Sequence, residues 1–449
     1  MVGSPQQSTT ELLAFAAAQV IPAPGCRPWD YGWSVPGYRH SPDAAISGPS
    51  GPVTFRRDGL LAWEDAVTAL LKERSIRDRW SAGELWGIVA SITVAASLSK
   101  ERTSFLDKKV QALRSCGPAL NVVLIANVTW NRPSLALDDV VVGYAKQEFL
   151  DLVNLVAGSR NSIDQATGGG WLRDSVQSRL RAEDDPVPVA FACWTVGQWQ
   201  LADKETDRRL QDVVNLCLLL ERDLKAHRVH RRGDANRPGV RGLTLDRGAI
   251  ERGVIDSAHL ELGSTPLIVR DLFADRCGAS WFGTEPLPLG DLLDQEYLRD
   301  AVEACLGDDP VSARIRVASR WYAEAHYTLA SDDAALALGV AMDALLGGQR
   351  VLPGSAMADR FALLATDPHE RRERARNYLD LYAVRSSVAH GGRSRRLDQG
   401  DFLERYQTAV RWAAWRTIAL RDAFAPPTEK DIDELFDELR WGSRVWNEG

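Results

Sequence analysis

An arginine and a histidine stand five residues apart in the stretch LYAVRSSVAHGG, which covers residues 381 to 392. Histidine titrates near neutral pH, so His390 could take or give the proton of a sugar hydroxyl. The guanidinium of Arg385 could hold a phosphate and stabilise the extra charge of its transition state. Together the two side chains indicate phosphodiester chemistry on RNA that requires no metal ion.

The spacing alone is weak evidence, because a chain with 7 histidines and many arginines contains such pairs by chance. A second pair occurs in ERDLKAH, where Arg222 precedes His227. Asp223, His227 and His230 would share one stripe of a helix, as a metal site or as a second centre with Arg222. The interpretation we favour is a solvated basic helix end leading into a loop, KAHRVHRRGDANRPGVRG, whose cations could touch RNA phosphates.

The motif lies near the end of a predicted helix, residues 368–390. Asp367 can cap its first amides, Pro368 suits the first helical position, and Glu370 can complete a capping box. Gly391 and Gly392 end it. Five residues correspond to about 140° around a helix, so the two side chains leave different faces. The side chains of Arg385 and His390 can meet in one site only if the last helical turn loosens at the glycines, or if the site combines residues from two subunits.

Arginines flank the motif on both sides. Arg371, Arg372, Arg374 and Arg376 precede it, and Arg393, Arg395 and Arg396 follow it. Glu370 and Glu373 are placed to pair with the first group. We therefore assign RNA binding to Arg393, Arg395 and Arg396, as a local positive rim.

Residues 317–392 resemble the Apea-like branch of the HEPN superfamily of small helical-bundle domains. The similarity lies in the segments ALALGVAMDALLGG (335–348), MADRFALL (357–364) and YLDLYAVRSSVAHGG (378–392). In that family, a helix ending in an alanine-acid-x-leucine pattern precedes a helix reading Y-x-x-R-S-x-x-x-H-G. Five residues match the second pattern: Tyr382, Arg385, Ser386, His390 and Gly391. The acidic position, usually glutamate, holds Asp343. Ser386 agrees with this branch, whereas the wider superfamily often has Asn, Asp or His there.

The resemblance implies a homodimeric bundle in which two facing Arg/His pairs form a composite ribonuclease site. His390 would be the general acid or base, Arg385 would stabilise the phosphate, and Ser386 and Asp343 would orient them, with no metal and no cofactor. Similar domains act as toxins and in antiviral defence. Some relatives are inactive, so a dimerisation or nucleotide-binding scaffold is the alternative. A third hypothesis places catalysis in the front region, around Asp223 and His227.

Composition indicates an ordinary soluble protein. The chain has 449 residues, of which 45% are hydrophobic and 26% charged, and its net charge is −7, so any nucleic-acid site must be a local patch. Its six cysteines are scattered, and its opening resembles no secretory signal. The apolar run from Leu85 to Leu98 is too short to cross a membrane. P-loop, zinc-protease, esterase and dinucleotide motifs are absent. We expect a cytoplasmic protein without membrane partners.

Hydrophobic periodicity predicts an α+β protein with two parts. Residues 1–290 form a mixed α/β N-terminal region, which would sense infection or bind a regulatory partner protein, and residues 291–449 form an all-α HEPN helical bundle. In the front part we expect helices at 9–20, 60–79, 83–100, 146–158 and 203–226, and strands at 120–130, 138–144 and 187–194. In the second part we expect helices at 292–306, 311–329, 332–346, 355–365, 368–390, 399–424 and 429–440.

Overall fold

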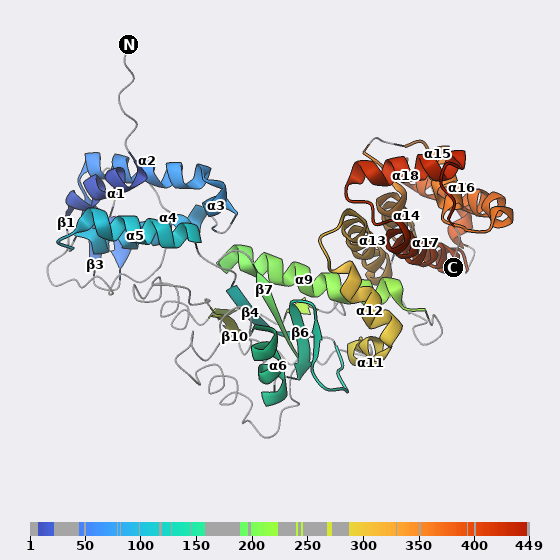
Figure 1. Cartoon of the computed structure of the whole chain (residues 1–449), viewed down its shortest axis with the longest axis horizontal. Coiled ribbons are helices and arrows are strands. Elements are labelled where there is room, and N and C mark those ends of the chain that lie inside the picture. Colours follow the sequence, from blue (N-terminus) through green and yellow to red (C-terminus); the bar gives the residue numbers. More distant parts are fainter. Residues whose placement is uncertain are drawn as a thin grey trace, which may run out of the picture. The chain divides into compact units, whose positions relative to one another are not determined.

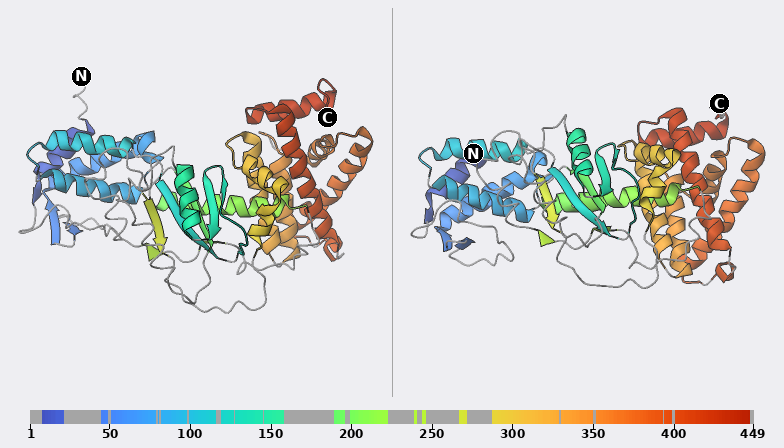
Figure 2. Two further views of the ribbon diagram at one scale, coloured as in Figure 1. Left: turned by 60° about the horizontal axis from the view of Figure 1, so that its bottom comes forward. Right: turned by 90° about the horizontal axis from the view of Figure 1, so that it is seen from below.

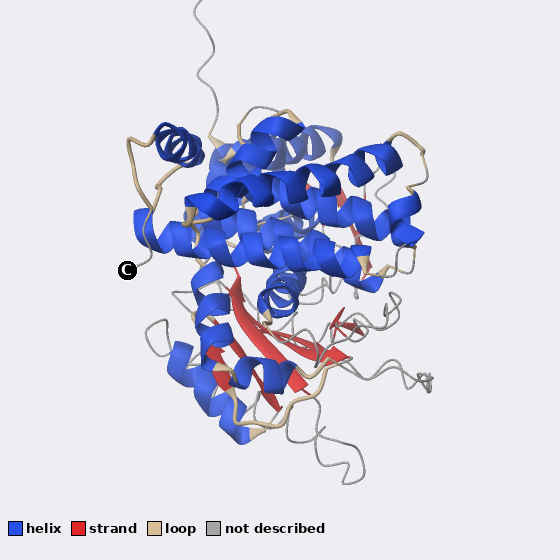
Figure 3. Cartoon of the chain, turned by 90° about the vertical axis from the view of Figure 1, so that its right-hand side faces the viewer, coloured by secondary structure: helices blue, strands red, loops and turns tan. Residues whose placement is uncertain are grey.

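The chain has an α+β fold, as predicted, in which helices outweigh strands among the described residues (Figure 3). The computed structural model describes residues 8–21, 45–48, 51–78, 80, 82–97, 99–115, 119–126, 128–144, 146–157, 189–195, 199–222, 239–240, 244–245, 267–271, 287–328, 330–349, 352–392, 394–398 and 401–446. They divide into two compact units. Unit 1 comprises Met1–Leu124, Asp139–Asp207 and Arg241–Arg276, and unit 2 comprises Ile125–Asp138, Arg208–Val240 and Cys277–Gly449.

Unit 1 begins with helices packed around one apolar core (Figure 1). They are α1 (Thr9–Ala18), α2 (Arg57–Lys72), α3 (Arg74–Arg77), α4 (Ala82–Ser97) and α5 (Arg102–Ser115). Ser8 and Glu11 close a capping box at the start of α1. The rings of Trp63 and Trp86 meet edge to face at 4.8 Å in the core. Helix α5 was not predicted from the sequence.

Two sheets contain the strands of unit 1. The smaller has the antiparallel order β1 (Val20–Ile21), β3 (Gly51–Phe55), β2 (Ala45–Gly48). The part of the larger sheet that unit 1 contributes has the order β6 (Val140–Tyr144), β7 (Val189–Thr195), β4 (Ala119–Ala126), β10 (Leu267–Asp271), β9 (Thr244–Leu245). Strand β10 runs parallel to β4, and β6 runs antiparallel to β7. The buried runs of β6 and β7 are the continuous apolar segments predicted as strands. Helix α6 (Gln147–Ala157) follows β6.

Unit 2 consists mainly of helices, which lie side by side in Figure 1 and in both views of Figure 2. They are the second part of α9 (Trp199–Leu220), then α11 (Leu289–Asp294), α12 (Glu296–Cys305), α13 (Pro310–Tyr327), α14 (Ser331–Leu346), α15 (Gly354–Leu363), α16 (Pro368–Ala389), the short 3₁₀ helix η4 (Arg395–Asp398), α17 (Phe402–Phe424) and α18 (Glu429–Trp441). Strands β5 (Leu135–Leu137) and β8 (Gly239–Val240) complete it. The predicted helix at 292–306 is two helices, because the backbone of Gln295 is extended.

Helix α14 lies at the centre of unit 2, packed against α13, α15, α16 and α17. Its buried side chains are mostly small, since Ala334, Ala335, Ala337, Gly339 and Ala341 leave room for neighbouring helices to approach closely. Larger buried side chains of the same helix, Leu338, Met342, Leu345 and Leu346, fill the remaining space. This close packing places α14 directly against α16, the helix of the Arg/His motif.

Candidate active site

The last turn of α14 is fixed by two buried arginines. Arg314 donates to the carbonyl oxygen of Gly347 at 2.7 Å, and Arg360 donates to those of Leu346 and Gly347 at 3.1 and 2.8 Å. These carbonyls would otherwise be unsatisfied, and they form the negative end of the helix dipole. Two cations therefore hold the turn that carries Asp343 in place.

Helix α16 begins and ends where the sequence predicts. The Asp367 carboxylate accepts a hydrogen bond from the backbone N–H of His369 at 2.8 Å, and Pro368 occupies the first turn. Gly391 ends the helix with φ +76°, a conformation that glycine adopts without strain. The predicted capping box is not observed, because the carboxylate of Glu370 pairs with Arg374 at 3.2 Å.

Arg385 and Asp343 form the central contact of the site, across α16 and α14. Nη2 of Arg385 donates to Oδ2 of Asp343 at 2.6 Å, and their side chains are 28% and 35% exposed. Aspartate, although shorter than glutamate, therefore reaches the arginine. Burial raises the pKa of Asp343, while the charge of Arg385 and its hydrogen bond lower that pKa, and the net shift is upward.

Two glycines make room for the side chains of the motif. A Cβ on Gly339 would lie 2.4 Å from Cγ of Arg385, so the arginine stem crosses α14 where α14 has no side chain. A Cβ on Gly354 would lie 2.7 Å from the ring of Tyr382. That ring stacks on Tyr378 at 6.2 Å and lies 5.8 Å from the Arg385 guanidinium. Arg385 is thus positioned by a carboxylate, a bare helix surface and an aromatic ring.

His390 leaves the helix on a different side. Its N–H still bonds to the carbonyl of Ser386 at 3.2 Å, so the last turn is not loosened at the glycines. Arg385 contacts α14, whereas His390 is exposed on the outer side, about 140° around the helix. Ser386 is half-buried beside Arg385. One chain therefore does not bring Arg385 and His390 onto a common face.

The arginines predicted to bind RNA divide into three cases. Arg395 is exposed in η4. Arg396 pairs with Asp380 at 3.0 Å, and both side chains are about half exposed or more, so the pair is weak. Arg393 lies outside the described residues, as do Asp223, His227 and His230. Within the part of the chain that is described, no group of three His, Cys, Asp or Glu side chains could hold a metal ion.

Two tyrosines near the pair were not singled out as site residues. Burial raises the pKa of Tyr378 on α16 and of Tyr406 on α17, and the charge of Asp343 raises both further. Both hydroxyls therefore stay protonated and can donate hydrogen bonds. The spacing of Tyr378 and Tyr382 put them on one face of the predicted helix, but nothing in the sequence relates Tyr406 to Asp343.

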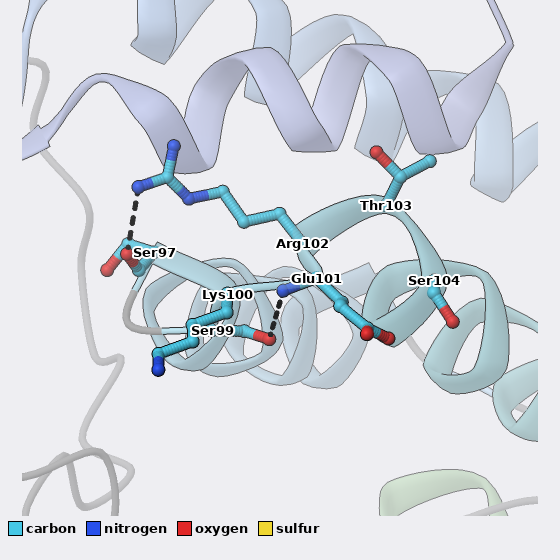
Figure 4. A pocket seen from close by; sticks show the side chains of 7 residues that line it. All are labelled: Ser97, Ser99, Lys100, Glu101, Arg102, Thr103 and Ser104. Carbon is cyan, nitrogen blue, oxygen red and sulfur yellow. Dashed lines mark hydrogen bonds between the residues drawn. The ribbon is translucent and has the colours of Figure 1, made fainter.

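An open pocket in unit 1 contains none of the predicted site residues (Figure 4). It is lined by the connection from α4 to α5, namely Ser97, Ser99, Lys100, Glu101, Arg102, Thr103 and Ser104. Arg102 donates to the carbonyl of Ser97 at 3.2 Å, and Ser99 accepts from the N–H of Glu101 at 3.2 Å (Figure 4). Both hydrogen bonds therefore stabilise the connection between α4 and α5.

Comparisons with known proteins add no assignment. The chain matches no protein-family model, no curated protein and no solved structure. Among the described helices, none combines the length and apolar character needed to cross a membrane.

Proposed function

We propose that the C-terminal helices form a HEPN-type bundle that acts as a metal-independent endoribonuclease. The observation that carries the proposal is the bond from Arg385 to Asp343, two residues that the family pattern relates and that lie 42 positions apart in the chain. Among the described residues, the guanidinium makes no second ion pair or hydrogen bond. Its remaining N–H groups can therefore donate to a phosphate.

The chemistry needs a proton carrier and an anion stabiliser. The 2′-hydroxyl of one nucleotide attacks the adjacent phosphorus and gives its proton to a histidine. The bond from phosphorus to the 5′ oxygen breaks, and that oxygen receives a proton from a second, protonated histidine. Arg385 stabilises the charge on the phosphorane oxygens. The products are a 2′,3′-cyclic phosphate and a 5′-hydroxyl.

In the proposed enzyme, a second copy of the chain supplies the second histidine that the reaction needs. The proposed homodimer joins through the outer stripe of α16, in which the exposed residues Arg372, Arg376, Leu379, Ala383 and His390 follow one another at helical spacing. An isologous contact there brings two His390 side chains to one cleft. The proposed role, by the HEPN resemblance, is an antiviral or toxin-like effector that unit 1 controls.

One observation favours the alternative of an inactive HEPN scaffold for dimerisation or nucleotide binding. Arg385 binds a carboxylate of its own bundle, which competes with any phosphate. The exposed position of His390 favours the nuclease.

The test is cleavage of total RNA and purified tRNA with EDTA present. Arg385→Ala and His390→Ala should each abolish cleavage, and wild-type products should carry cyclic-phosphate ends. His369→Ala and Asn377→Ala change exposed residues of the same helix that do not belong to the outer stripe, and both variants should cleave like the wild type. Cleavage that survives both motif substitutions refutes the assigned roles, and wild-type binding of RNA or nucleotide without cleavage favours the scaffold.

A further inference from the structure

Two buried tyrosines lie beside the pair of Arg385 and Asp343, and their hydroxyl groups have no partner. Tyr378 on α16 and Tyr406 on α17 are each 2% exposed. Neither hydroxyl forms a hydrogen bond within the part of the chain that the structure describes. A buried polar group without a partner lowers the stability of a fold, so these two hydroxyls require a physical explanation.

Helix packing brings both tyrosines to the side of α14 that carries Asp343. Tyr378, Tyr382 and Arg385 are spaced i, i+4 and i+7, so they lie on one stripe of α16. That stripe faces α14, because Arg385 binds Asp343 there and the ring of Tyr382 lies between Tyr378 and the guanidinium. Helix α17, which carries Tyr406, also packs against α14.

Asp343 is the anion that acts on both tyrosines. After burial, its charge is the largest cause of the raised pKa of Tyr378 and of Tyr406, and Arg385 is the cation that opposes it. Oδ2 of Asp343 accepts from Arg385, whereas Oδ1 accepts from no donor among the described residues. Two protonated hydroxyls therefore lie beside a carboxylate that can accept further hydrogen bonds.

A phosphate on Arg385 would change the balance of charge at the site. The guanidinium carries one positive charge, which Asp343 already neutralises. A phosphate on the remaining N–H groups places a second anion close to Asp343, in a half-buried position where water screens the repulsion only in part. Hydrogen bonds from neutral hydroxyls to Asp343 reduce that repulsion without adding another ion.

We infer that Tyr378 and Tyr406 are positioning residues, whose hydroxyls donate hydrogen bonds to Asp343 when Arg385 binds a phosphate. The inference rests on the proposed function, because it assigns a role within the same site. Both tyrosines act through Asp343, which can then keep Arg385 in place with a phosphate beside it.

A double-mutant cycle on the full chain tests the inference without RNA. Arg385→Met removes the cation from Asp343, as a phosphate does in part when it shares the guanidinium. Urea unfolding at pH 8, which favours the ionised carboxylate, compares Tyr378→Phe and Tyr406→Phe in the wild-type and Arg385→Met backgrounds. In the wild-type background, loss of an unbonded hydroxyl should leave the urea midpoint unchanged or raise it. In the Arg385→Met background, each substitution should lower the midpoint by about 0.5 M, because Asp343 then depends on the hydroxyls.

RNA cleavage by the variant with both tyrosines replaced by phenylalanine provides a second measurement, which does not require Arg385→Met to fold. This variant should be at least as stable as the wild type and should cleave RNA roughly tenfold more slowly. A loss of activity without a loss of stability distinguishes a positioning role from a structural one.

Tyr322→Phe is the matched control. Tyr322 on α13 is 3% exposed, and its hydroxyl accepts a hydrogen bond from Arg411 of α17. Its loss should lower the urea midpoint equally in both backgrounds and leave cleavage unchanged. Equal effects of the Tyr378 and Tyr406 substitutions in both backgrounds overturn the inference, as does a wild-type cleavage rate in the double tyrosine variant. A wild-type chain that cleaves no RNA refutes the proposed function instead, and the cycle still decides whether the hydroxyls bind Asp343.

Discussion

Arg385 and His390 differ in what holds them. The arginine is fixed by Asp343, by the ring of Tyr382 and by the bare surface at Gly339. The histidine is exposed at a helix end, and with the described residues only its backbone N–H forms hydrogen bonds. In the proposed nuclease, Arg385 would therefore be a preorganised phosphate binder, and His390 would be a proton carrier whose environment the second subunit completes.

Asp343→Asn tests whether Asp343 positions Arg385. The pKa of Asp343 is raised in the folded state, so the fold is stabilised when this carboxyl group is protonated. That stabilisation is complete at pH values below the ordinary carboxyl pKa, and it is lost as the pH rises through the raised pKa. Asparagine, which resembles the neutral acid, should leave the free energy of unfolding at pH 7 unchanged or higher. Cleavage should fall about 10- to 100-fold, because the guanidinium loses its anchor.

Urea unfolding between pH 4 and pH 8, beside cleavage rates, measures both effects. The stability difference between wild type and Asp343→Asn should shrink towards low pH. A variant that is destabilised at pH 7 and cleaves normally would contradict both the burial argument and the positioning role.

Helix ends decide where the site residues lie. Gly391, directly after His390, and Gly442, at the end of α18, both have φ above +70°, and a Cβ on either would meet nothing within 4 Å. Gly391 adjoins a candidate site residue, and Gly442 does not. Substituting each glycine therefore distinguishes the free-energy cost of a strained helix end from the effect of moving His390.

Gly391→Ala and Gly442→Ala should each lower the free energy of unfolding by about 1 kcal/mol, since alanine is strained at positive φ. Only Gly391→Ala should also slow cleavage. Urea denaturation and the RNA cleavage assay, made on the same preparations, provide the comparison. Equal cleavage by the two variants would show that the position of His390 is unimportant.

Helices were predicted best where caps and periodicity agreed. The ends of α13, α14, α16 and α18 lie within two residues of their predicted positions, because proline, glycine and capping residues act locally. Helix α5 was missed because its segment is strongly polar; its buried residues, Leu106, Val110 and Leu113, are defined only by packing in the unit 1 core. The break at Gln295 likewise has no local sequence signal.

At the scale of the whole molecule, dimerisation is the property on which the proposed function depends. Leu379 is 44% exposed in the outer stripe of α16, between Arg376 and Ala383. In an isologous contact, each side chain near the axis meets a copy of its own surface. A carboxylate placed there is desolvated and approaches its like-charged partner.

Leu379→Asp should therefore convert a dimer into a folded monomer and abolish cleavage at the same time. Light scattering coupled to size-exclusion chromatography measures the mass. Leu155→Asp, on α6 of unit 1 and 76% exposed, is the control and should remain dimeric and active. A wild-type monomer that cleaves RNA would refute the composite site.

The sequence by itself determined the α+β class, most helices and the placement of Arg385 and His390 near one helix end, because these depend on local periodicity, caps and glycines. Only the tertiary structure decided that Asp343 binds Arg385, and that the Arg385 side chain crosses α14 at Gly339, where no side chain blocks it. It also decided that Asp212 accepts hydrogen bonds from arginines of both α9 and α13. Except for Arg208, which lies four positions before Asp212, these contacts join residues dozens to more than a hundred positions apart. Their geometry is set by helix packing, in which each side chain occupies the space that distant neighbours leave.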